Sequence, residues 1–424
     1  MSTKNVLLVG GHGNYKTGLN YVLMFIAKAL EKNGYSISYA SISGGDTRSN
    51  YISGKYPFFD CTRDPRLFRD AVERVRPDIV ITFDDIWHLE RVEYARDSYP
   101  FLWIHYLITE EANLSPLKMT RNNDQMGRVD LRPSLQRCDI VVPCTEMAEQ
   151  VGKSWRLSNL TPIIRPPIPD STFSFNKAQR KEFREKNGYG ADDFVFLLVV
   201  RNFIRKNIPF VLQALSSLII SYRRQNVEIK PKLFMHVPRM PQIPLIGYDM
   251  DYLISIYENA VTLKDSDKAE RFLKLSTENP EDLFQTMTDQ EMNRIYSGCD
   301  CMISLPYAEG IGYPPIEGGL TNLPVIYGQG GYPKFYLGSN PEENFKVETD
   351  YHFVPPGMNQ VWYSSDMKST VEAMNQAVQK YVHGKRASKN RESLIKFFGN
   401  NSGKEWANLV ESLISKYSNK GIPA

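Results

Sequence analysis

Short apolar runs alternate with segments of helical periodicity along the first third of the chain, and this alternation limits the folds that the chain can adopt. The apolar runs have the length of buried strands and lie at residues 6–9, 35–41, 78–83, 101–105 and 139–142. Residues 18–33 place Val22, Ile26 and Leu30 on one stripe and end at Gly34, and residues 67–75 form a second amphipathic segment. Strands separated by helices join in parallel through right-handed crossovers, so the pattern predicts a doubly wound α/β sheet.

The alternation stops at residues 163–169 and then begins again. Pro166, Pro167 and Pro169 cannot continue a helix or a central strand, so we predict a linker at this point. Strands are predicted at 194–200, 232–236, 301–305 and 324–326, and helices at 208–222, 289–297 and 316–321. The boundaries of the elements within residues 237–288 cannot be predicted from the pattern.

Two such halves indicate two facing Rossmann-like domains, at residues 1–168 and 169–385, followed by C-terminal helices at 386–424 that pack back on the first domain. In sheets of this kind ligands bind at the carboxyl ends of the strands. We therefore expect the binding site in the cleft between the two domains.

A glycine-rich turn follows the strand predicted at 301–305. Gly310 and Gly312 lie in this turn, and the prolines that follow suit the first turn of a helix. The exposed amides of such a turn form an anion site, for which a diphosphate is a natural ligand. Glu309 can accept hydrogen bonds from sugar hydroxyls, and Glu317 can reach a ribose diol. The alternative interpretation is an ordinary strand–turn–helix with two surface glutamates.

Three cations follow the strand predicted at 194–200: Arg201, Arg205 and Lys206. Cations at the carboxyl end of a strand would neutralise a diphosphate and stabilise a leaving phosphate. Arginine can bind phosphate through two parallel hydrogen bonds, and lysine acts as a point charge. The alternative interpretation is a solvated basic loop.

Together these two segments resemble those of the retaining GT-B glycosyltransferases of sequence family 4. That family carries two glutamates eight residues apart in a glycine-rich loop, as Glu309 and Glu317 are here. It also carries an arginine five residues before a lysine after the first strand of its second domain, as Arg201 and Lys206 are here. The resemblance is strong over residues 194–335, which include 288–296 and Gly330-Gly331, and looser over 1–165.

The resemblance implies a role for each matching residue. Arg201 and Lys206 would bind the donor diphosphate and stabilise the departing nucleotide. Glu309 would contact the donor sugar and Glu317 the ribose. The backbone of Gly310, Ile311 and Gly312 would hold the phosphate and the sugar. No cofactor is implied beyond the donor substrate, for which a UDP- or GDP-sugar is expected.

The resemblance also implies residues of the first domain. A histidine at the end of the fourth strand lies beside the donor sugar in the family, and His105 matches that place. The alternative is a core histidine that bonds to a backbone carbonyl. The loop 10–18 would close over the diphosphate, with Gly18 as its best candidate and His12 and Lys16 as weaker ones.

Some positions depart from the family pattern. Ile311 replaces an aromatic residue, and residues 313–315 replace a run that contains leucine. Asn207 and Asn322 stand where glycine is common. Since none of these changes removes a charged contact, they leave the identity of the sugar open more than the reaction.

Three further features carry less weight. Asp84-Asp85 follows a predicted strand and could be taken for a metal pair, but GT-B enzymes need no bound metal, so we predict none, with an acceptor-side role as the alternative. Glu110-Glu111 lies after His105 and could face the acceptor. The basic stretch 380–396 is interpreted as a solvated helix face, with membrane or nucleic-acid contact as the alternative.

Composition excludes several other classes of protein. The chain has 51 basic and 48 acidic residues and a net charge of +3, which gives no overall attraction to nucleic acid or an anionic membrane. Its five cysteines form no paired CxxC motif, which argues against a disulfide framework or a zinc site. The N-terminal apolar run is too short for a signal peptide, and we therefore expect a soluble, cytoplasmic protein with peripheral membrane contact left open.

The sequence thus predicts transfer of a sugar from a nucleotide-sugar to an acceptor hydroxyl, with retention of the anomeric configuration. The rivals are a GT-B sugar phosphorylase or epimerase, and a non-catalytic nucleotide-sugar-binding protein. The acceptor could be a glycan, a lipid-linked sugar, a protein, a small molecule or modified DNA. The first-domain loops 44–60 and 106–130 would select it. Donor sugar, base, linkage and oligomeric state are not predicted.

Overall fold

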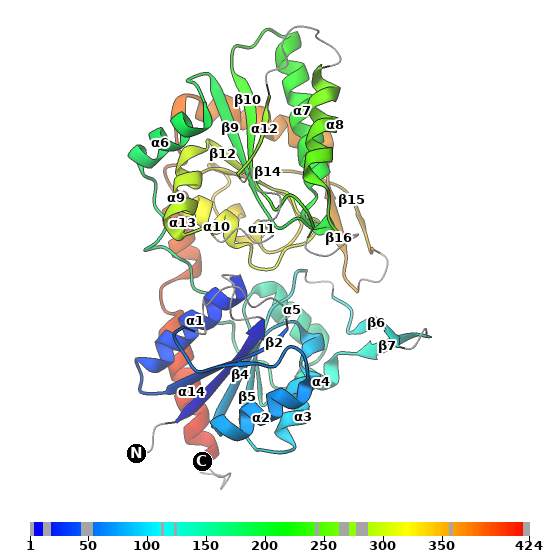
Figure 1. Cartoon of the computed structure of the whole chain (residues 1–424), viewed down its shortest axis with the longest axis vertical. Helices are drawn as coiled ribbons and strands as arrows, with labels where there is room; N and C mark the ends of the chain where they lie inside the picture. Colours follow the sequence, from blue (N-terminus) through cyan, green and yellow to red (C-terminus); the bar gives the residue numbers. More distant parts are fainter. Residues whose placement is uncertain are drawn as a thin grey trace. The chain divides into compact units, whose positions relative to one another are not determined.

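The chain folds as two compact units. The computed structural model describes residues 4–11, 18–43, 54–111, 114–122, 125–241, 246–262, 271–276, 287–355 and 359–418. Unit 1 comprises Met1–Pro167, Pro355–Gln360 and Phe398–Ala424, and unit 2 comprises Ile168–Val354 and Val361–Phe397 (Figure 1). Unit 1 therefore contains the C-terminal helix. It also contains the short segment Pro355–Gln360, although the residues before and after this segment in the sequence belong to unit 2.

Unit 1 is built on a six-stranded parallel sheet of order β3-β2-β1-β4-β5-β8. Its strands are β1 (Asn5–Gly11), β2 (Ser36–Ser43), β3 (Phe58–Asp60), β4 (Ile79–Phe83), β5 (Leu102–Leu107) and β8 (Ile140–Pro143). The central strands are buried on both faces, which is why they are nearly continuous apolar runs in the sequence.

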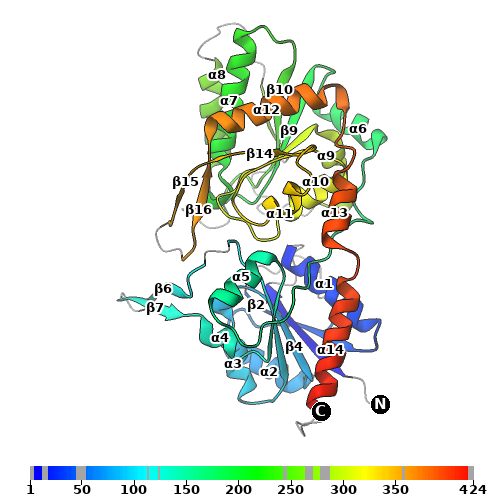
Figure 2. The ribbon, with the colours of Figure 1, turned by 180° about the vertical axis from the view of Figure 1, so that it is seen from behind.

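Helices cover both faces of this sheet. They are α1 (Gly18–Glu31), α2 (Pro65–Val75), α3 (Glu90–Arg96), α4 (Arg132–Gln136), α5 (Glu146–Ser154) and α14 (Ser402–Ser418). Helices α2, α3 and α5 share one core cluster with the strands. Helix α14 packs on α1 (Figure 2). Its Trp406 is buried edge-on against Tyr106, with ring centroids 5.0 Å apart.

Unit 2 repeats the same architecture, with a six-stranded parallel sheet of order β11-β10-β9-β12-β13-β14. Its strands are β9 (Asp193–Val199), β10 (Lys230–His236), β11 (Leu273–Leu275), β12 (Cys301–Ser304), β13 (Val325–Tyr327) and β14 (Phe345–Lys346). The two sheets have the same doubly wound order, so the predicted fold class of two Rossmann-like domains is confirmed.

The helices of unit 2 are α6 (Lys177–Asn187), α7 (Ile208–Arg224), α8 (Met250–Thr262), α9 (Asp289–Gly298), α10 (Tyr313–Leu320), α11 (Pro333–Gly338), α12 (Met367–Tyr381) and α13 (Asn390–Phe398). Helices α7, α8 and α12 share the main core cluster with the sheet. Helix α9 begins at a capping box of Thr288 and Glu291, which satisfies two backbone amides at its N-terminus.

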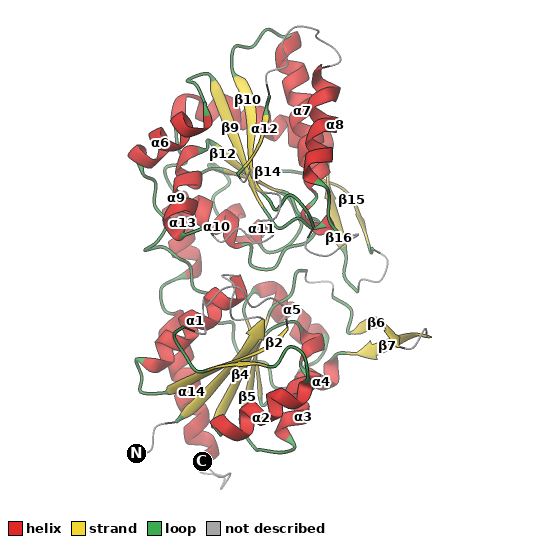
Figure 3. Cartoon of the chain, in the orientation of Figure 1, coloured by secondary structure: helices red, strands yellow, loops and turns green. Residues whose placement is uncertain are grey.

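Two antiparallel hairpins stand outside the six-stranded sheets (Figure 3). In unit 1, β6 (Leu117–Asn122) pairs with β7 (Gln125–Asp130). In unit 2, β15 (Thr349–Phe353) pairs with β16 (Trp362–Ser365). Neither hairpin was predicted from the sequence. No helix in the described part of the chain is long and apolar enough to cross a membrane.

Candidate functional site

Two loops of unit 2 meet at the carboxyl ends of neighbouring strands. One follows β9 and contains the 3-10 turn η2 (Ile204–Lys206), and the other runs from β12 to α10. The Tyr307 amide donates to the Arg205 carbonyl at 2.9 Å, and the Arg205 guanidinium donates to the Ala308 carbonyl at 2.5 Å. The two motifs found in the sequence therefore form one structural element.

A cation–carboxylate cluster lies where these loops meet. The Lys206 ammonium donates to the Glu309 carboxylate, and the Arg205 guanidinium lies 3.6 Å from the same oxygen. Burial by itself raises the pKa of Glu309, but Lys206, Arg205 and Arg201 together outweigh burial and lower the pKa below its usual value. Glu309 is therefore an ionised carboxylate held among three cations.

Arg201 differs from the other two cations in its exposure. Its side chain is exposed and has no hydrogen-bond partner in the described parts of the chain, although its charge interacts with Arg205 and Glu309. The adjacent Asn202 is buried and fixes the loop, because its amide donates to the carbonyls of Pro238 and Tyr248 at 2.9 and 2.6 Å. The loop thus presents a cation on an anchored backbone.

The glycine turn brings backbone amides to the same place. Gly312 has a φ of +72° and forms the N-cap of α10. A Cβ at this position would lie 2.9 Å from the Pro333 ring, and the Gly312 carbonyl accepts from the Tyr336 hydroxyl at 2.9 Å. Gly310 and Ile311 are buried beside it. Pro314 and Pro315 carry no N–H in the first turn of α10, so the amides available to attract an anion here are those of the glycine turn.

A third loop, between β13 and α11, crosses the backbone of Glu309. A Cβ on Gly331 would come within 2.1 Å of the Glu309 carbonyl oxygen, and Gly331 has a φ of +96°. The Tyr332 amide donates to that carbonyl at 3.0 Å. A Cβ on Gly330 would come equally close to the Pro306 carbonyl oxygen. The paired glycines therefore allow a close backbone crossing that positions Glu309, a role that the sequence alone did not reveal.

Glu317 lies on the second turn of α10, half-buried. The Tyr296 hydroxyl of α9 donates to one of its carboxylate oxygens at 2.7 Å. Burial raises the pKa of Tyr296 well above its ordinary value, and Glu317 raises it further, so the hydroxyl remains protonated and orients the carboxylate.

His105 lies inside unit 1. It is the fourth residue of β5 rather than the last, because the strand continues to Leu107. Its ring is fully buried, and Nδ1 lies 2.9 Å from the Thr82 hydroxyl. Burial lowers the pKa of His105 to about 3, with Asp84 opposing the shift, so the ring is neutral at neutral pH. Its Nε2 has no partner among the described residues.

The remaining first-domain candidates are placed as follows. Gly18 is the first residue of α1. His12 and Lys16 lie outside the described residues. Glu110 accepts a hydrogen bond from the Gln360 amide at 3.0 Å, and Glu111 is buried.

Asp84, Asp85 and His88 come close together after β4 and could hold a metal ion, with the ligand atoms within 4.8 Å of one another. Within this group the Asp84 carboxylate already accepts from the Asp85 amide at 2.7 Å, from the Ser43 hydroxyl at 2.6 Å and faces His88 Nδ1 at 3.1 Å. These contacts give the Asp84 carboxylate a structural role, so we assign no metal to the group.

The interpretation of the basic stretch 380–396 as a solvated face is wrong for two of its arginines. Arg386 donates to the Ser297 carbonyl and stacks 4.6 Å above the Phe175 ring. Arg391 donates to the carbonyls of Phe173 and Asp170. Both arginines hydrogen-bond to backbone carbonyls of other segments of unit 2, a role that charge patterning cannot reveal.

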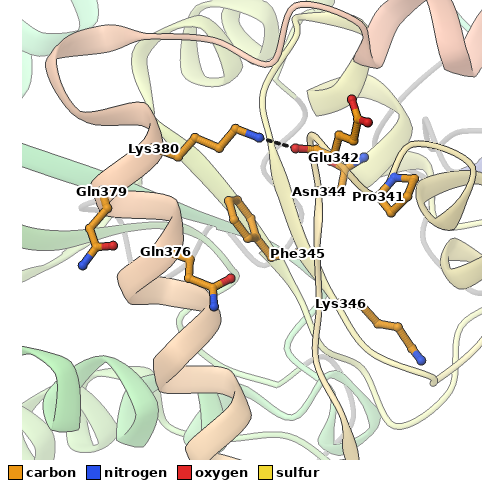
Figure 4. A pocket seen from close by; sticks show the side chains of 8 residues that line it. All are labelled: Pro341, Glu342, Asn344, Phe345, Lys346, Gln376, Gln379 and Lys380. Carbon is orange, nitrogen blue, oxygen red and sulfur yellow. Dashed lines mark hydrogen bonds between the residues drawn. The ribbon is translucent and has the colours of Figure 1, made fainter.

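If only the shape of the protein surface is considered, a binding site would be sought in another part of unit 2. A cleft of about 590 Å³ lies beside β14 and α12, and includes Glu342, Lys346 and Lys380 (Figure 4). Lys380 donates to the Glu342 carbonyl there. None of the lining residues belongs to the loops after β9 and β12. We locate the candidate site at those loops, because they combine clustered charge with constrained glycines.

Comparison with known proteins identifies the fold. No family model matches the chain, and no curated protein matches its sequence. Among solved structures, sucrose-phosphate synthase from Thermosynechococcus elongatus has 15% identity and a TM-score of 0.67, covering 97% of this chain and 100% of that one. Anabaena HepE in complex with UDP-glucose has 14% identity and a TM-score of 0.65, covering 97% and 99%. The structure of "Trehalose-6-phosphate from E. coli bound with UDP-2-fluoro glucose" has 12% identity and a TM-score of 0.63, covering 96% of this chain and 98% of that one. The chain has the GT-B fold.

Proposed function

We propose that this chain is a nucleotide-sugar-dependent glycosyltransferase that retains the anomeric configuration, as the resemblance to sequence family 4 implies. The observation that carries the proposal is the cluster of Arg201, Arg205 and Lys206 around Glu309, beside the N-terminus of α10. Structural neighbours support it, because Anabaena HepE was solved with UDP and with UDP-glucose.

The cluster provides a site for a donor diphosphate in unit 2. Arg201 is free to bind a phosphate, and Lys206 can exchange its bond to Glu309 for one to the donor, which leaves Glu309 to accept hydrogen bonds from the donor sugar. The amides of Gly310, Ile311 and Gly312 would hold phosphate and sugar, and Glu317 would bind the ribose. The roles of Gly18 and His105 in unit 1 remain predictions from the family resemblance.

In the proposed reaction the bond between the anomeric carbon and the β-phosphate oxygen breaks, and a bond from the acceptor oxygen forms on the same face of the sugar. The acceptor proton passes to the leaving phosphate. The cations stabilise the negative charge that develops on that phosphate, and this electrostatic term would dominate catalysis. The proposal needs no metal ion.

A thermal-shift panel of UDP-, GDP- and ADP-sugars tests the donor half of the reaction. A ligand at 100 times its dissociation constant stabilises the folded state by about 2.7 kcal/mol, so the true donor should raise the melting temperature measurably. A phosphorylase would instead release sugar phosphate when given inorganic phosphate and a glycan. A non-catalytic binder would show the thermal shift but no transfer to any acceptor.

A further inference from the structure

Arg205 is bonded at two points to the loop that carries Glu309. Its carbonyl accepts from the Tyr307 amide at 2.9 Å, and its guanidinium donates to the Ala308 carbonyl at 2.5 Å. Tyr307 and Ala308 directly precede Glu309 in the sequence, and Ala308 is fully buried. Moving the guanidinium away would leave a buried carbonyl without this bond, which is unfavourable. The side chain of Arg205 is therefore fixed beside Glu309.

Lys206 contacts Glu309 in a different way. Its ammonium donates to a carboxylate oxygen of Glu309, and the same oxygen lies 3.6 Å from the Arg205 guanidinium. A phosphate can replace a carboxylate as the partner of a lysine, because both are anions that accept hydrogen bonds. Lys206 can therefore exchange Glu309 for a donor phosphate, whereas Arg205 would have to give up its bond to the Ala308 carbonyl.

The charge of Glu309 after this exchange depends on the groups that stay around it. Its side chain is only 18% exposed, and burial favours the protonated form of a carboxyl group. In the described part of the chain, the ionisable groups that interact with Glu309 are Lys206, Arg205 and Arg201 from the loop after β9, and Tyr336 of α11. Burial raises the pKa of Tyr336 well above its ordinary value, so its hydroxyl carries no charge. If Arg201 and Lys206 bind phosphate, Arg205 is the cation that remains for Glu309.

We infer that Arg205 is a positioning residue of the proposed transfer reaction. It holds Glu309 in place and ionised, as a hydrogen-bond acceptor for the donor sugar, while Lys206 binds the donor phosphate. The inference rests on the proposed function and divides the three cations into two kinds. Arg201 and Lys206 contact the donor, whereas Arg205 acts through Glu309.

Calorimetric titration of UDP and GDP tests this division of roles. Each titration at pH 7 is repeated in two buffers of different ionisation enthalpy, which gives the number of protons taken up per nucleotide bound. Arg205→Gln removes the charge, so the buried Glu309 should gain a proton when Lys206 leaves it. We expect this variant to take up about half a proton more than wild type.

Two further variants serve as controls for the titration. Arg205→Lys keeps the charge and should take up as many protons as wild type does. The excess uptake should disappear in the double variant Arg205→Gln/Glu309→Gln, because the group that gains the proton is no longer ionisable. Arg205→Met replaces Arg205→Gln in all measurements if the glutamine variant does not fold.

A measurement without nucleotide tests the same role. Lys206→Ala mimics the loss of Lys206 to the donor, and Arg205 should still keep the pKa of Glu309 low in this variant. In Lys206→Ala/Arg205→Gln the pKa of Glu309 should instead lie above its unfolded value, so the stability of the folded state increases as the pH falls through this range. The urea midpoint of the double variant, relative to that of Lys206→Ala, should therefore rise between pH 8 and pH 5.

Equal proton uptake by wild type and Arg205→Gln, or an excess that persists without Glu309, would overturn the inference. A difference between the two urea midpoints that does not change with pH would also overturn it. If neither UDP nor GDP binds wild type, the proposed function fails, whereas the urea comparison still decides whether Arg205 keeps Glu309 ionised.

Discussion

At the scale of single residues, the central contact joins Lys206 to Glu309, which are 103 positions apart in the chain. The motif spacing identified both residues, but it could not show that their side chains meet. The folded structure also adds Arg205, which the family pattern did not single out. Three cations then hold one carboxylate ionised despite its burial, and this arrangement is suited to binding phosphate.

Replacing Lys206 by alanine should lower the turnover number for sugar transfer by roughly 100- to 1000-fold, because a charge that stabilises the leaving phosphate is lost. Lys181→Ala is a suitable control, since Lys181 is an exposed lysine of α6 paired with Glu185. Initial rates with saturating donor and acceptor provide the measurement. Near-normal turnover of Lys206→Ala would contradict the assigned role.

The burial of His105 predicts how the stability of the protein depends on pH. Its folded pKa of about 3 lies below the ordinary 6.5, so the unfolded state binds more protons between these values and stability falls as pH falls below about 6.5. Between pH 7 and pH 5 this linkage should cost about 2 kcal/mol. In urea unfolding, His105→Asn should lose that much less stability over the same interval than wild type. An equal loss in both proteins would show that His105 is not buried as a neutral ring.

The backbone conformation explains two departures from the family pattern. Asn207 and Asn322 have φ values of 55° and 58°, in the left-handed region that favours glycine. Asparagine tolerates this conformation better than other residues that carry a Cβ. The backbone at both positions can therefore match that of a glycine, and neither change needs to alter the site.

At the scale of elements, the parallel strands could be predicted from the sequence and the hairpins could not. Strands β1, β4 and β9 are buried on both faces and appear as apolar runs bounded by turns. Strand β15 is largely exposed, and its alternation of polar and aromatic residues covers only the four residues Asp350–Phe353, so its pairing with β16 is needed to identify it. The role of Gly330-Gly331 could not be predicted for a similar reason, since a close backbone crossing is a tertiary contact.

That crossing can be tested with Gly331→Ala. The new Cβ would meet the Glu309 backbone, so the loop must shift, and we expect the variant to be about 1–3 kcal/mol less stable than Gly188→Ala. Gly188 is a fair comparison, because it also has a positive φ but has open space around it. Urea unfolding gives the stability difference, and the melting-temperature shift with donor shows whether the site is lost. Equal effects of the two substitutions would contradict the crossing.

At the scale of the whole molecule, the chain returns to its first unit at the end. Helix α14 packs on α1, and Trp406 is fully buried. Trp406→Ala should therefore lower the free energy of unfolding by about 3–5 kcal/mol. Lys404→Ala, on the same helix, should change it by less than about 0.5 kcal/mol. Scanning calorimetry provides both values, and a near-neutral Trp406→Ala would mean that α14 is not part of the core of unit 1.

The proposed function depends on whether the cluster after β9 and β12 binds the diphosphate of a nucleotide-sugar. Calorimetric titration of UDP and GDP into wild type, Lys181→Ala and the double variant Arg201→Ala/Lys206→Ala measures this directly. We predict that at least one nucleotide binds wild type and Lys181→Ala alike, and binds the double variant at least tenfold more weakly. Equal binding by all three proteins, or no binding of either nucleotide to wild type, would contradict the account.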